Sequence, residues 1–366
     1  MQSTIHTLWI VFLSLMTPTL SHPTHHASWT PLAPLPLPRQ EHTTVFLPPS
    51  TIAVLGGIIP TNASFAASPL PITTTSLVHL YSISDDTWNT AAPLPRAMNH
   101  INAAVIDGRI YVLGGLADLG QVEPAWRAVG DAYVYDPSSN TWKEIPAVPP
   151  GEERGSAAVG VCGSKIVLAG GMTDLELSGN RRQNTVAVVS VFDTESARWE
   201  NVSEAAMYLP EGRDHAAAAV VDSKMYVLGG REQGQENVKD TVFVLDLKNL
   251  EAGWRVRGAR MLTPRGGVAA GVVGKKVYVL GGEGNADVES GVFDEVEVYD
   301  TRKDKWQSVG PMRIPRHGTY AVGVENRVYV PGGGVRQSGA PVSAFDVFES
   351  STSGCKTRSC SPHAFG

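Results

Sequence analysis

Arginine recurs at regular places in this sequence and could build an anion-binding site. Six apolar segments end in a Gly-Gly pair, and an arginine lies sixteen to eighteen residues before the first glycine of each pair. Guanidinium groups bind carboxylates and sulfates through paired hydrogen bonds. We therefore consider an anion-binding ring formed by Arg39, Arg96, Arg154, Arg213, Arg265 and Arg316.

Histidines gather near the same places. The chain has 10 histidines, and four of them lie fourteen or fifteen residues before a Gly-Gly pair: His42, His100, His215 and His317. Imidazole can carry a proton near neutral pH. If the protein is an enzyme, His100 or His215 would carry the proton, and Arg213 or Arg316 would orient the substrate.

Other chemistries have little support in the residues. The sequence has no GxSxG nucleophile motif, and its Gly-Gly pairs lack the context of a phosphate-binding loop. The three cysteines form no CxxC pair and no other spacing typical of a zinc site. We therefore predict no metal site and no cofactor.

These arginines and histidines follow a repeat that must also set the fold. The six segments are IAVLGG, IYVLGG, IVLAGG, MYVLGG, VYVLGG and VYVPGG, and their second glycines are 51 to 59 residues apart. Tryptophan recurs at intervals of 52 to 59 residues, at Trp29, Trp88, Trp142, Trp199, Trp254 and Trp306. Two independent markers thus give one period.

Each repeat is typical of four short antiparallel strands. A hairpin precedes the Gly-Gly pair, and a strand ending in Tyr-Asp or Phe-Asp and a strand with the tryptophan follow it. Such a small sheet buries both faces only against neighbouring sheets, so we predict an all-β, six-bladed propeller over residues 22–350 with the tryptophans packed between blades. The sixth repeat has no tryptophan after Phe348. The segment with Trp29 should therefore supply its last strand and close the ring.

This pattern resembles the kelch-repeat family, within the galactose oxidase and kelch-type propeller superfamily. The resemblance rests on the double glycine, the Tyr-Asp before the tryptophan and the Pro-Arg that opens the next repeat, and it covers roughly residues 29–350. It implies that the arginines and histidines can instead bridge neighbouring blades. It also offers metal-free sugar mutarotases for comparison. Copper oxidation as in galactose oxidase is not favoured, because Cys162 is expected at the end of the propeller opposite the channel mouth.

Loops around one mouth of a propeller channel are where a ligand site is expected. The six loops between strands two and three differ in length and charge: 58–75, 116–130, 172–185, 231–240, 283–295 and 334–342. The polar and aromatic residues expected at this rim are Asp118, Trp126, Arg127, Asp174, Arg181, Arg182, Arg231, Glu283, Asp287 and Arg336.

Composition excludes some partners. The formal net charge is −6, and 42% of the residues are hydrophobic. An acidic chain without runs of lysine and arginine is a poor candidate for binding nucleic acid or an anionic membrane. We expect a monomer without a nucleic-acid partner and without a membrane span.

The first residues suggest secretion. Residues 8–16 (LWIVFLSLM) form an apolar run that is too short to span a bilayer and is typical of a signal peptide, so we expect residues 1–21 to be removed. Asn62 and Asn201 begin acceptor sequons for N-glycosylation. The expected location is therefore the secretory pathway or the extracellular space.

The cysteines agree with an oxidising compartment. Cys355 and Cys360 lie in a polar C-terminal tail, residues 351–366, with four residues between them. We expect them to form a disulfide, which leaves Cys162 unpaired.

Two functions from different classes remain open. The first is a secreted binding module that recognises an anionic protein segment, glycan or small molecule at the channel mouth. The second is a metal-free isomerase, epimerase or cyclase that acts on a small molecule or sugar in the same pocket.

Overall fold

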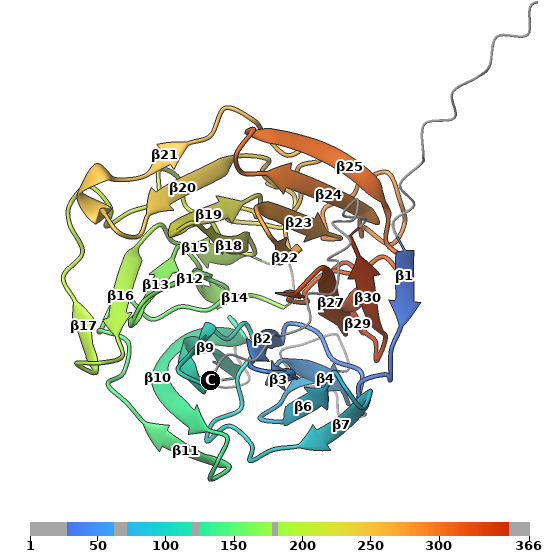
Figure 1. The fold of residues 1–366 in the computed structure, drawn as a ribbon, viewed down its shortest axis with the longest axis horizontal. Helices are drawn as coiled ribbons and strands as arrows, with labels where there is room; N and C mark the ends of the chain where they lie inside the picture. Colours follow the sequence, from blue (N-terminus) through green and yellow to red (C-terminus); the bar gives the residue numbers. More distant parts are fainter. Residues whose placement is uncertain (1–27, 62–71, 119–123, 178–181, 351–366) are drawn as a thin grey trace, which may run out of the picture.

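The computed structural model describes residues 28–61, 72–118, 124–177 and 182–350. Within them the chain is strand and turn, apart from the short 3-10 helix η1 (Leu250–Ala252). Six blades of four strands surround a central channel (Figure 1), which confirms the all-β, six-bladed propeller. No described helix is long and apolar enough to cross a bilayer. The residues expected to form a signal peptide, 1–21, lie outside the described residues, as do Asn62, Arg181, Cys355, Cys360 and the tail 351–366.

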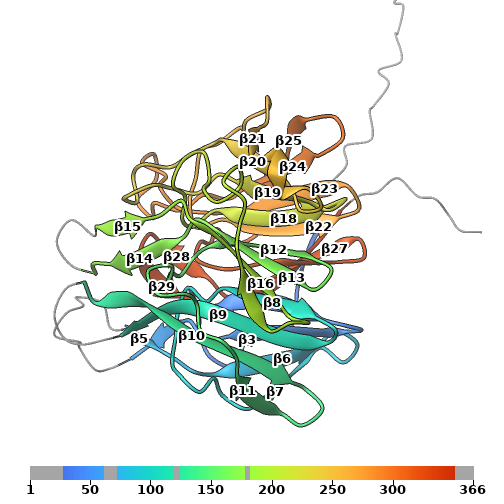
Figure 2. The same ribbon diagram turned by 90° about the vertical axis from the view of Figure 1, so that its left-hand side faces the viewer.

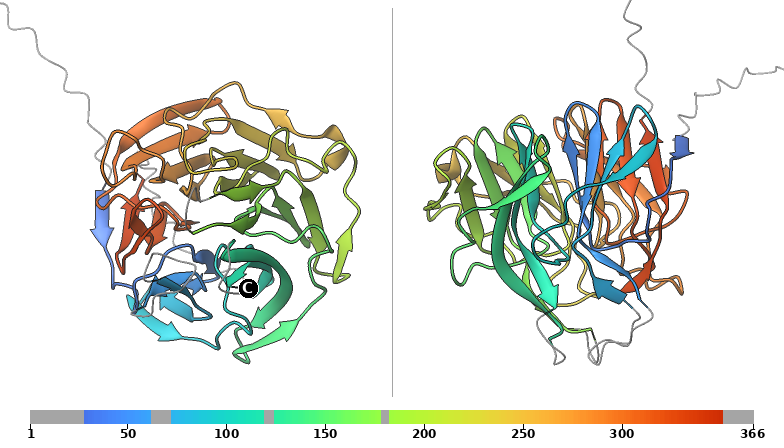
Figure 3. Two further views of the ribbon diagram at one scale, coloured as in Figure 1. Left: turned by 180° about the vertical axis from the view of Figure 1, so that it is seen from behind. Right: turned by 90° about the horizontal axis from the view of Figure 1, so that it is seen from below.

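Each blade is an antiparallel sheet whose first strand lines the channel and whose fourth strand lies outermost (Figures 1 and 3). The strands, blade by blade, are β2 (Thr43–Leu47), β3 (Thr51–Leu55), β6 (Val78–Ser82) and β7 (Thr87–Thr90); β8 (Ala103–Ile106), β9 (Arg109–Asp118), β10 (Trp126–Asp136) and β11 (Thr141–Glu144); β12 (Ala158–Cys162), β13 (Lys165–Ala169), β16 (Val189–Asp193) and β17 (Arg198–Glu200); β18 (Ala217–Val221), β19 (Lys224–Leu228), β20 (Val242–Asp246) and β21 (Arg255–Val256); β22 (Ala269–Val273), β23 (Lys276–Leu280), β24 (Glu295–Asp300) and β25 (Lys305–Pro311); and β26 (Val322–Val324), β27 (Arg327–Pro331), β30 (Phe345–Glu349) and β1 (Ser28–Pro31). Neighbouring blades cover both faces of a sheet, so second strands such as β19 and β23 have four consecutive buried residues.

The N-terminal strand closes the ring, as the sequence predicts. Strand β1 pairs with β30, with Trp29 opposite Phe348 and their ring centroids 5.2 Å apart. The indole Nε1 of Trp29 donates to the carbonyl of Pro311 in blade 5 at 3.0 Å. Strand β1 covers the edge of β30 that would otherwise be exposed in blade 6. Because β1 comes from the opposite end of the chain, this pairing also joins the two chain ends without a covalent bond.

Four other repeat tryptophans, Trp88, Trp142, Trp199 and Trp254, also connect neighbouring blades. The indole of Trp88 donates to the carbonyl of Ala33 at 2.8 Å, and that of Trp142 donates to Ala92 at 2.9 Å. Trp199 and Trp254 make the equivalent bonds to Pro146 and Ala206 at 3.1 Å. These tryptophans are half-buried scaffold residues, and no stacking platform is needed to explain them.

The Gly-Gly pair lets neighbouring blades approach through the backbone. Gly281 has a φ of +59° and Gly282 has a φ of +117°, which side chains rarely allow. The N–H of Gly282 donates to the carbonyl of Arg316 at 2.9 Å, and a Cβ atom on Gly281 would collide with that oxygen. Equivalent bonds join Gly57 to Met98, Gly171 to Arg213, Gly230 to Arg265 and Gly333 to Arg39.

Loops between strands two and three build a wall around one mouth of the channel. Three of them contain short hairpins: β4 (Ile58–Pro60) with β5 (Ile72–Thr74), β14 (Met172–Leu175) with β15 (Gln183–Thr185), and β28 (Gly334–Arg336) with β29 (Gly339–Pro341). Strands β9 and β10 extend past their blade, and β10 pairs with β14 through Trp126 and Leu175. Figure 2 shows these hairpins on one side of the propeller.

Replacing Trp29 tests the closure. We expect Trp29→Ala to lower the free energy of unfolding by about 2 to 3 kcal/mol, because it removes the contact with Phe348 and the bond to blade 5. Urea unfolding is the measurement. Leu37→Ala is the control in the same segment, since Leu37 is 41% exposed and its loss should cost under about 0.5 kcal/mol. Equal unfolding curves for Trp29→Ala and wild type would contradict the closure.

Candidate functional site

Five of the six predicted arginines are buried and bonded inside the scaffold. Arg39, Arg154, Arg213, Arg265 and Arg316 are at most 1% exposed. Arg316 donates to the carbonyl of Ala344 and to the carboxylate of Asp346, both at 2.8 Å, and Arg265 donates to Glu297 at 2.7 Å. Burial lowers the pKa of Arg39, Arg154 and Arg316 to about 10, so these groups stay charged at neutral pH.

The expected ring of anion-binding arginines is therefore corrected. The guanidinium groups already donate to carbonyl, hydroxyl and carboxylate oxygens, as Arg154 does to Gly170 at 2.7 Å and to Ser190 at 3.0 Å. Arg213 is held by Thr241 at 2.6 Å, so neither it nor Arg316 is placed to orient a substrate. The sixth arginine, Arg96, is 41% exposed and pairs with Asp131 at 2.6 Å.

A closed ring of hydrogen bonds surrounds the channel at its mouth. One residue from each blade takes part, and we call this set the axial ring: Glu41, His100, Ser156, His215, Gly267 and Gly318. Each backbone N–H donates to the carbonyl of the preceding member at 2.6 to 3.0 Å, except that the N–H of His215 donates to the hydroxyl of Ser156 at 3.1 Å. All six have a φ between 50° and 63°. This repeated left-handed turn fixes the direction of each side chain.

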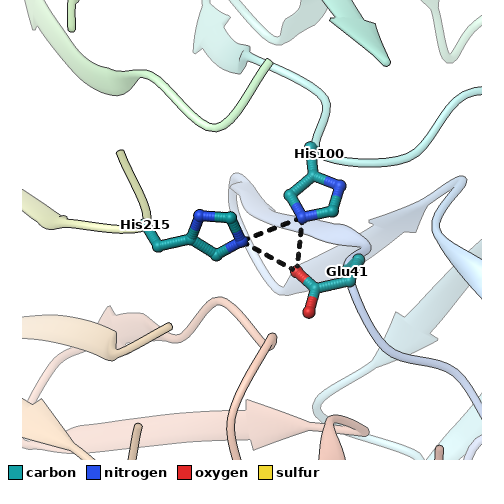
Figure 4. Close-up of side chains that lie close together, drawn as sticks. All are labelled: Glu41, His100 and His215. Carbon is teal, nitrogen blue, oxygen red and sulfur yellow. Dashed lines mark hydrogen bonds and ion pairs between the residues drawn. The ribbon is translucent and has the colours of Figure 1, made fainter. Parts of the chain in front are cut away.

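Three side chains of the axial ring meet in the centre (Figure 4). His100 Nε2 lies 3.0 Å from Glu41 Oε2 and 3.0 Å from His215 Nε2, and His215 Nε2 lies 3.9 Å from Glu41 Oε2. All three residues are buried. The sequence names His100 and His215 as separate candidates at the mouth, and in the structure their Nε2 atoms lie 3.0 Å apart.

Neighbouring polar groups fix both imidazoles. His100 Nδ1 lies 2.6 Å from Asn99 Oδ1, and His215 Nδ1 lies 2.6 Å from Asp214 Oδ1. Both oxygens act as acceptors, so each Nδ1 donates and each Nε2 faces the centre. Arg231 Nη2 lies 3.0 Å from His215 Nε2, its Nε donates to Asp214 at 3.3 Å, and its Nη1 donates to Glu283.

His317 lies beside the same group, next to a second carboxylate. Its Nε2 donates to the carbonyl of Arg336 at 2.7 Å, and its Nδ1 lies 3.3 Å from Glu283 and 3.8 Å from Glu41. Among the residues that the structure describes, the buried carboxylates Glu41, Asp214 and Glu283 therefore face the buried guanidinium of Arg231.

Charge interactions shift the protonation of this group. Burial alone would raise the pKa of Glu41, but His100, His215 and His317 together hold it well below its usual range. Burial and the positive charge of Arg231 lower the pKa of His215. Burial would raise the pKa of Asp214 as well, yet the bond from His215 keeps it below its ordinary value. Glu41 and Asp214 are thus ionised at neutral pH.

The cluster forms the floor of a small pocket. Trp126, Leu175 and Leu177 form its apolar side, and the ring centroids of His100 and Trp126 are 5.6 Å apart. The centre of a water-sized sphere has about 30 Å³ in which to move, more than one water needs, within a hollow of about 390 Å³ that includes space open to solvent. Its full lining is Gln40, Glu41, His100, Trp126, Leu175, Glu176, Leu177, His215, Arg231, Gln235, Glu283 and Ser338.

One predicted residue, His42, does not belong to the site. It is fully buried, 3.5 Å from the hydroxyl of Thr319, and burial together with Arg39 lowers its pKa to about 3. Its expected place beside His100 is taken by Glu41. Counting two residues forward from Arg39 and from Met98 gives Glu41 and His100, whereas counting fourteen residues back from the first glycine gives His100 but selects His42 in place of Glu41. That offset is the signal in the sequence that identifies Glu41.

Replacing a buried arginine tests its scaffold role. Arg265→Met leaves Glu297, which is 1% exposed, without its ion pair, so we expect a loss of about 3 to 5 kcal/mol in the free energy of unfolding. Urea unfolding is the measurement. Adding Glu297→Leu should recover much of the loss, because the uncompensated charge is then removed.

Arg260→Met is the matched control for this test, because Arg260 is 62% exposed and forms an ion pair with Asp240. We expect it to cost under about 1 kcal/mol. A similarly small loss in Arg265→Met would contradict the scaffold role.

Comparisons with known proteins agree with this fold. Residues 149–334 match the KLHDC2/KLHL20/DRC7 Kelch-repeats domain, and residues 98–149 match the Kelch motif. The solved structure described as "Structure of YjhT" superposes with a TM-score of 0.67 at 18% identity, over 86% of this chain and 95% of that one. This likeness concerns the fold alone.

Sequence relatives carry several different names. Kelch-like protein terF of Aspergillus terreus (strain NIH 2624 / FGSC A1156) is 37% identical over 298 residues, which are 81% of this chain and 61% of that protein. Beta-scruin of Limulus polyphemus is 24% identical over 241 residues, 65% of this chain and 24% of that protein. N-acetylneuraminate epimerase of Pasteurella multocida (strain Pm70) is 26% identical over 306 residues, 70% of this chain and 79% of the enzyme. The chain thus spans less than two thirds of the first two relatives. With six glycine-paired blades and these matches, the chain belongs to the kelch-repeat family.

Proposed function

We propose that this kelch propeller binds a small molecule in the pocket at the channel mouth. The observation that carries the proposal is the convergence of ionisable side chains from different blades on one buried point. Buried charges are costly, and the backbone bonds of the axial ring already join the blades here, so the presence of these charges at a mouth favours a ligand site. The relevant contacts are those of Glu41, His100 and His215 at 3.0 to 3.9 Å.

The charge of the pocket restricts the ligand. Glu41, Asp214 and Glu283 contribute three negative charges and Arg231 one positive charge, which gives −2 if the imidazoles are neutral. An anionic protein segment, glycan or small molecule, as expected from the sequence, therefore meets net repulsion at the floor. Anion binding needs an additional positive charge, whereas a neutral or cationic group enters without one.

An isomerase or epimerase of small molecules is the second candidate function. The observation that favours it is the relative named N-acetylneuraminate epimerase, which this chain matches over 79% of the enzyme's length. His100 and His215 face the pocket floor and would act on the bound molecule. With Arg213 and Arg316 bonded inside the scaffold, Arg231 is the arginine at this floor.

We also propose that the protein works in the secretory pathway or outside the cell. The support is the apolar run at residues 8–16 and the two sequons in the sequence. Asn201 lies on the surface, where a glycosyltransferase could reach it.

A charge reversal at the rim tests the ligand pocket. Small molecules, including sugars, sugar acids and amines, are screened by saturation-transfer NMR on the full chain. Glu176→Lys should change the affinity of charged hits about three- to tenfold, raising it for anions and lowering it for cations. Glu195→Lys makes the same charge change in the exposed turn between β16 and β17 and should have no effect. Charged hits that respond equally to both variants, or to neither, would place the ligand elsewhere. Hits followed in D₂O that exchange a carbon-bound proton support the isomerase.

Glycan analysis tests secretion. In a eukaryotic host, we expect the protein in the medium without residues 1–21 and with a mass that falls on treatment with an N-glycosidase. Asn201→Gln should reduce this mass difference, whereas Asn249→Gln, an exposed asparagine outside any sequon, should leave it unchanged. Retention inside cells with Met1 present and no glycan would reject the proposal.

A further inference from the structure

We propose that Glu41, His100 and His215 bind one divalent transition-metal cation, with one coordination position open to the pocket. The metal site stands on the geometry of these three residues. Only the role of its open position, which is to hold a ligand oxygen, rests on the proposed small-molecule function.

The spacing of the three donor atoms fits a shared ion. Metal bonds of about 2.0 to 2.1 Å place neighbouring ligand atoms of a tetrahedral ion about 3.3 Å apart. The observed distances are 3.0 Å and 3.9 Å from Glu41 Oε2 to the two Nε2 atoms and 3.0 Å between the Nε2 atoms. The three atoms form a triangle of the size that one face of such a coordination shell requires (Figure 4).

The surrounding residues orient both imidazoles as a metal would need. Asn99 Nδ2 donates to the hydroxyl of Thr74 at 2.8 Å, so the amide oxygen of Asn99 faces His100 Nδ1. Asp214 accepts from His215 Nδ1 at 2.6 Å, which is the carboxylate–histidine arrangement common behind metal ligands. With each Nδ1 donating, a neutral His100 and a neutral His215 direct two lone pairs at each other across 3.0 Å. Together with the Glu41 carboxylate, three electron-pair donors face one point, and a cation there removes their mutual repulsion.

Charge favours a doubly positive ion. The floor of the pocket carries a formal −2 with neutral imidazoles, as counted above for Glu41, Asp214, Glu283 and Arg231. The three carboxylate side chains are between 0% and 8% exposed, so water screens them poorly. A divalent cation brings this count to zero.

Arg231 is the group that the ion must displace. Its Nη2 lies 3.0 Å from His215 Nε2 and donates to the lone pair that a metal would use. Arg231 keeps Asp214 and Glu283 as partners when that contact is lost, so its charge remains paired. Metal binding therefore exchanges one hydrogen bond of Arg231 for a coordination bond of His215.

The ligand set indicates the class of ion. Two imidazoles and one carboxylate suit Zn²⁺ or Fe²⁺, and three protein ligands with an open position are typical of sites that bind a further molecule. The space beside the cluster that the centre of a water molecule can occupy is about 30 Å³, so a water or a ligand oxygen fits there. Such an ion also supplies the positive charge that an anionic ligand of the pocket needs.

Metal titration of the full chain is the test. After treatment with a chelator and its removal, we expect the wild type to bind one Zn²⁺ by calorimetry and elemental analysis. Co²⁺ should give the visible absorption of a four-coordinate ion. Zn²⁺ should raise the melting temperature, because it binds only the folded chain. Glu41→Gln and His100→Asn should weaken Zn²⁺ binding at least about 100-fold, more than the loss usual for residues behind a ligand.

His79→Gln is the matched control, since His79 contacts Arg39 at 2.7 Å inside blade 1 and should leave Zn²⁺ binding unchanged. Circular dichroism verifies that each variant is folded, and the wild type with and without chelator provides a comparison that needs no variant. The proposal is overturned if wild type binds no Zn²⁺ at millimolar concentration, or if Glu41→Gln binds Zn²⁺ as wild type does. Repeating the NMR screen with a chelator present separates the two proposals, because hits that persist support the pocket without the metal.

Discussion

The axial ring of hydrogen bonds is the constraint on which the rest of this structure depends. Six blades can share one axis only if the backbone groups nearest the axis find partners, because a buried N–H or carbonyl without one is costly. Here each blade supplies one residue in a left-handed turn, and the N–H of that residue reaches the blade before it. Five of the six Gly-Gly pairs serve the same purpose one layer further out, where the N–H of the second glycine donates to the carbonyl two residues before the next ring member. The ring therefore fixes both the blade number and the positions from which side chains can enter the mouth.

A backbone ring leaves its side chains free to differ. Glu41, His100 and His215 occupy three positions, and Ser156 uses its hydroxyl to replace one missing carbonyl contact. Gly267 and Gly318 fill the other two, and a Cβ atom on Gly318 would collide with the Glu41 carboxylate. The backbone thus closes the ring independently of its ionisable side chains, since removing the side chain of Glu41, His100 or His215 does not remove a bond of the ring. This separation of backbone closure from side-chain chemistry explains how ionisable groups accumulate at the axis without weakening the blades.

The sequence predicts the fold better than the site, for physical reasons. The period of the Gly-Gly pairs and tryptophans follows from close blade contact, so it is visible in the chain, and the missing tryptophan of the sixth repeat reveals that Trp29 closes the ring. The type of a residue does not reveal its partner. Arg265 and Arg316 look like anion ligands until Glu297 and Asp346 are seen beside them. Glu41 gains its importance only from its contacts with His100 and His215, which belong to other blades and lie far from it in the chain.

The wrong prediction of His42 as a site residue shows which distance along the chain is constant between the blades. In blade 1 the segment between the arginine and the first glycine is one residue longer than in blades 3 to 6, so counting back from Gly56 selects His42, whereas counting forward from Arg39 selects Glu41. The structure follows the second count, because the carbonyl of residue 39 is bonded to Gly333 of the preceding blade and residue 41 continues the ring. The extra residue of blade 1 lies between Glu41 and Gly56, in the segment that contains the β2–β3 hairpin. An added residue there does not change the hydrogen bonds of the axial ring. The constant distance is therefore the two residues between the carbonyl of Arg39 and the ring residue Glu41, because both make hydrogen bonds to the preceding blade. Within this chain, side chains two positions after that carbonyl are the ones that meet at the axis, and their chemistry decides what the mouth can bind.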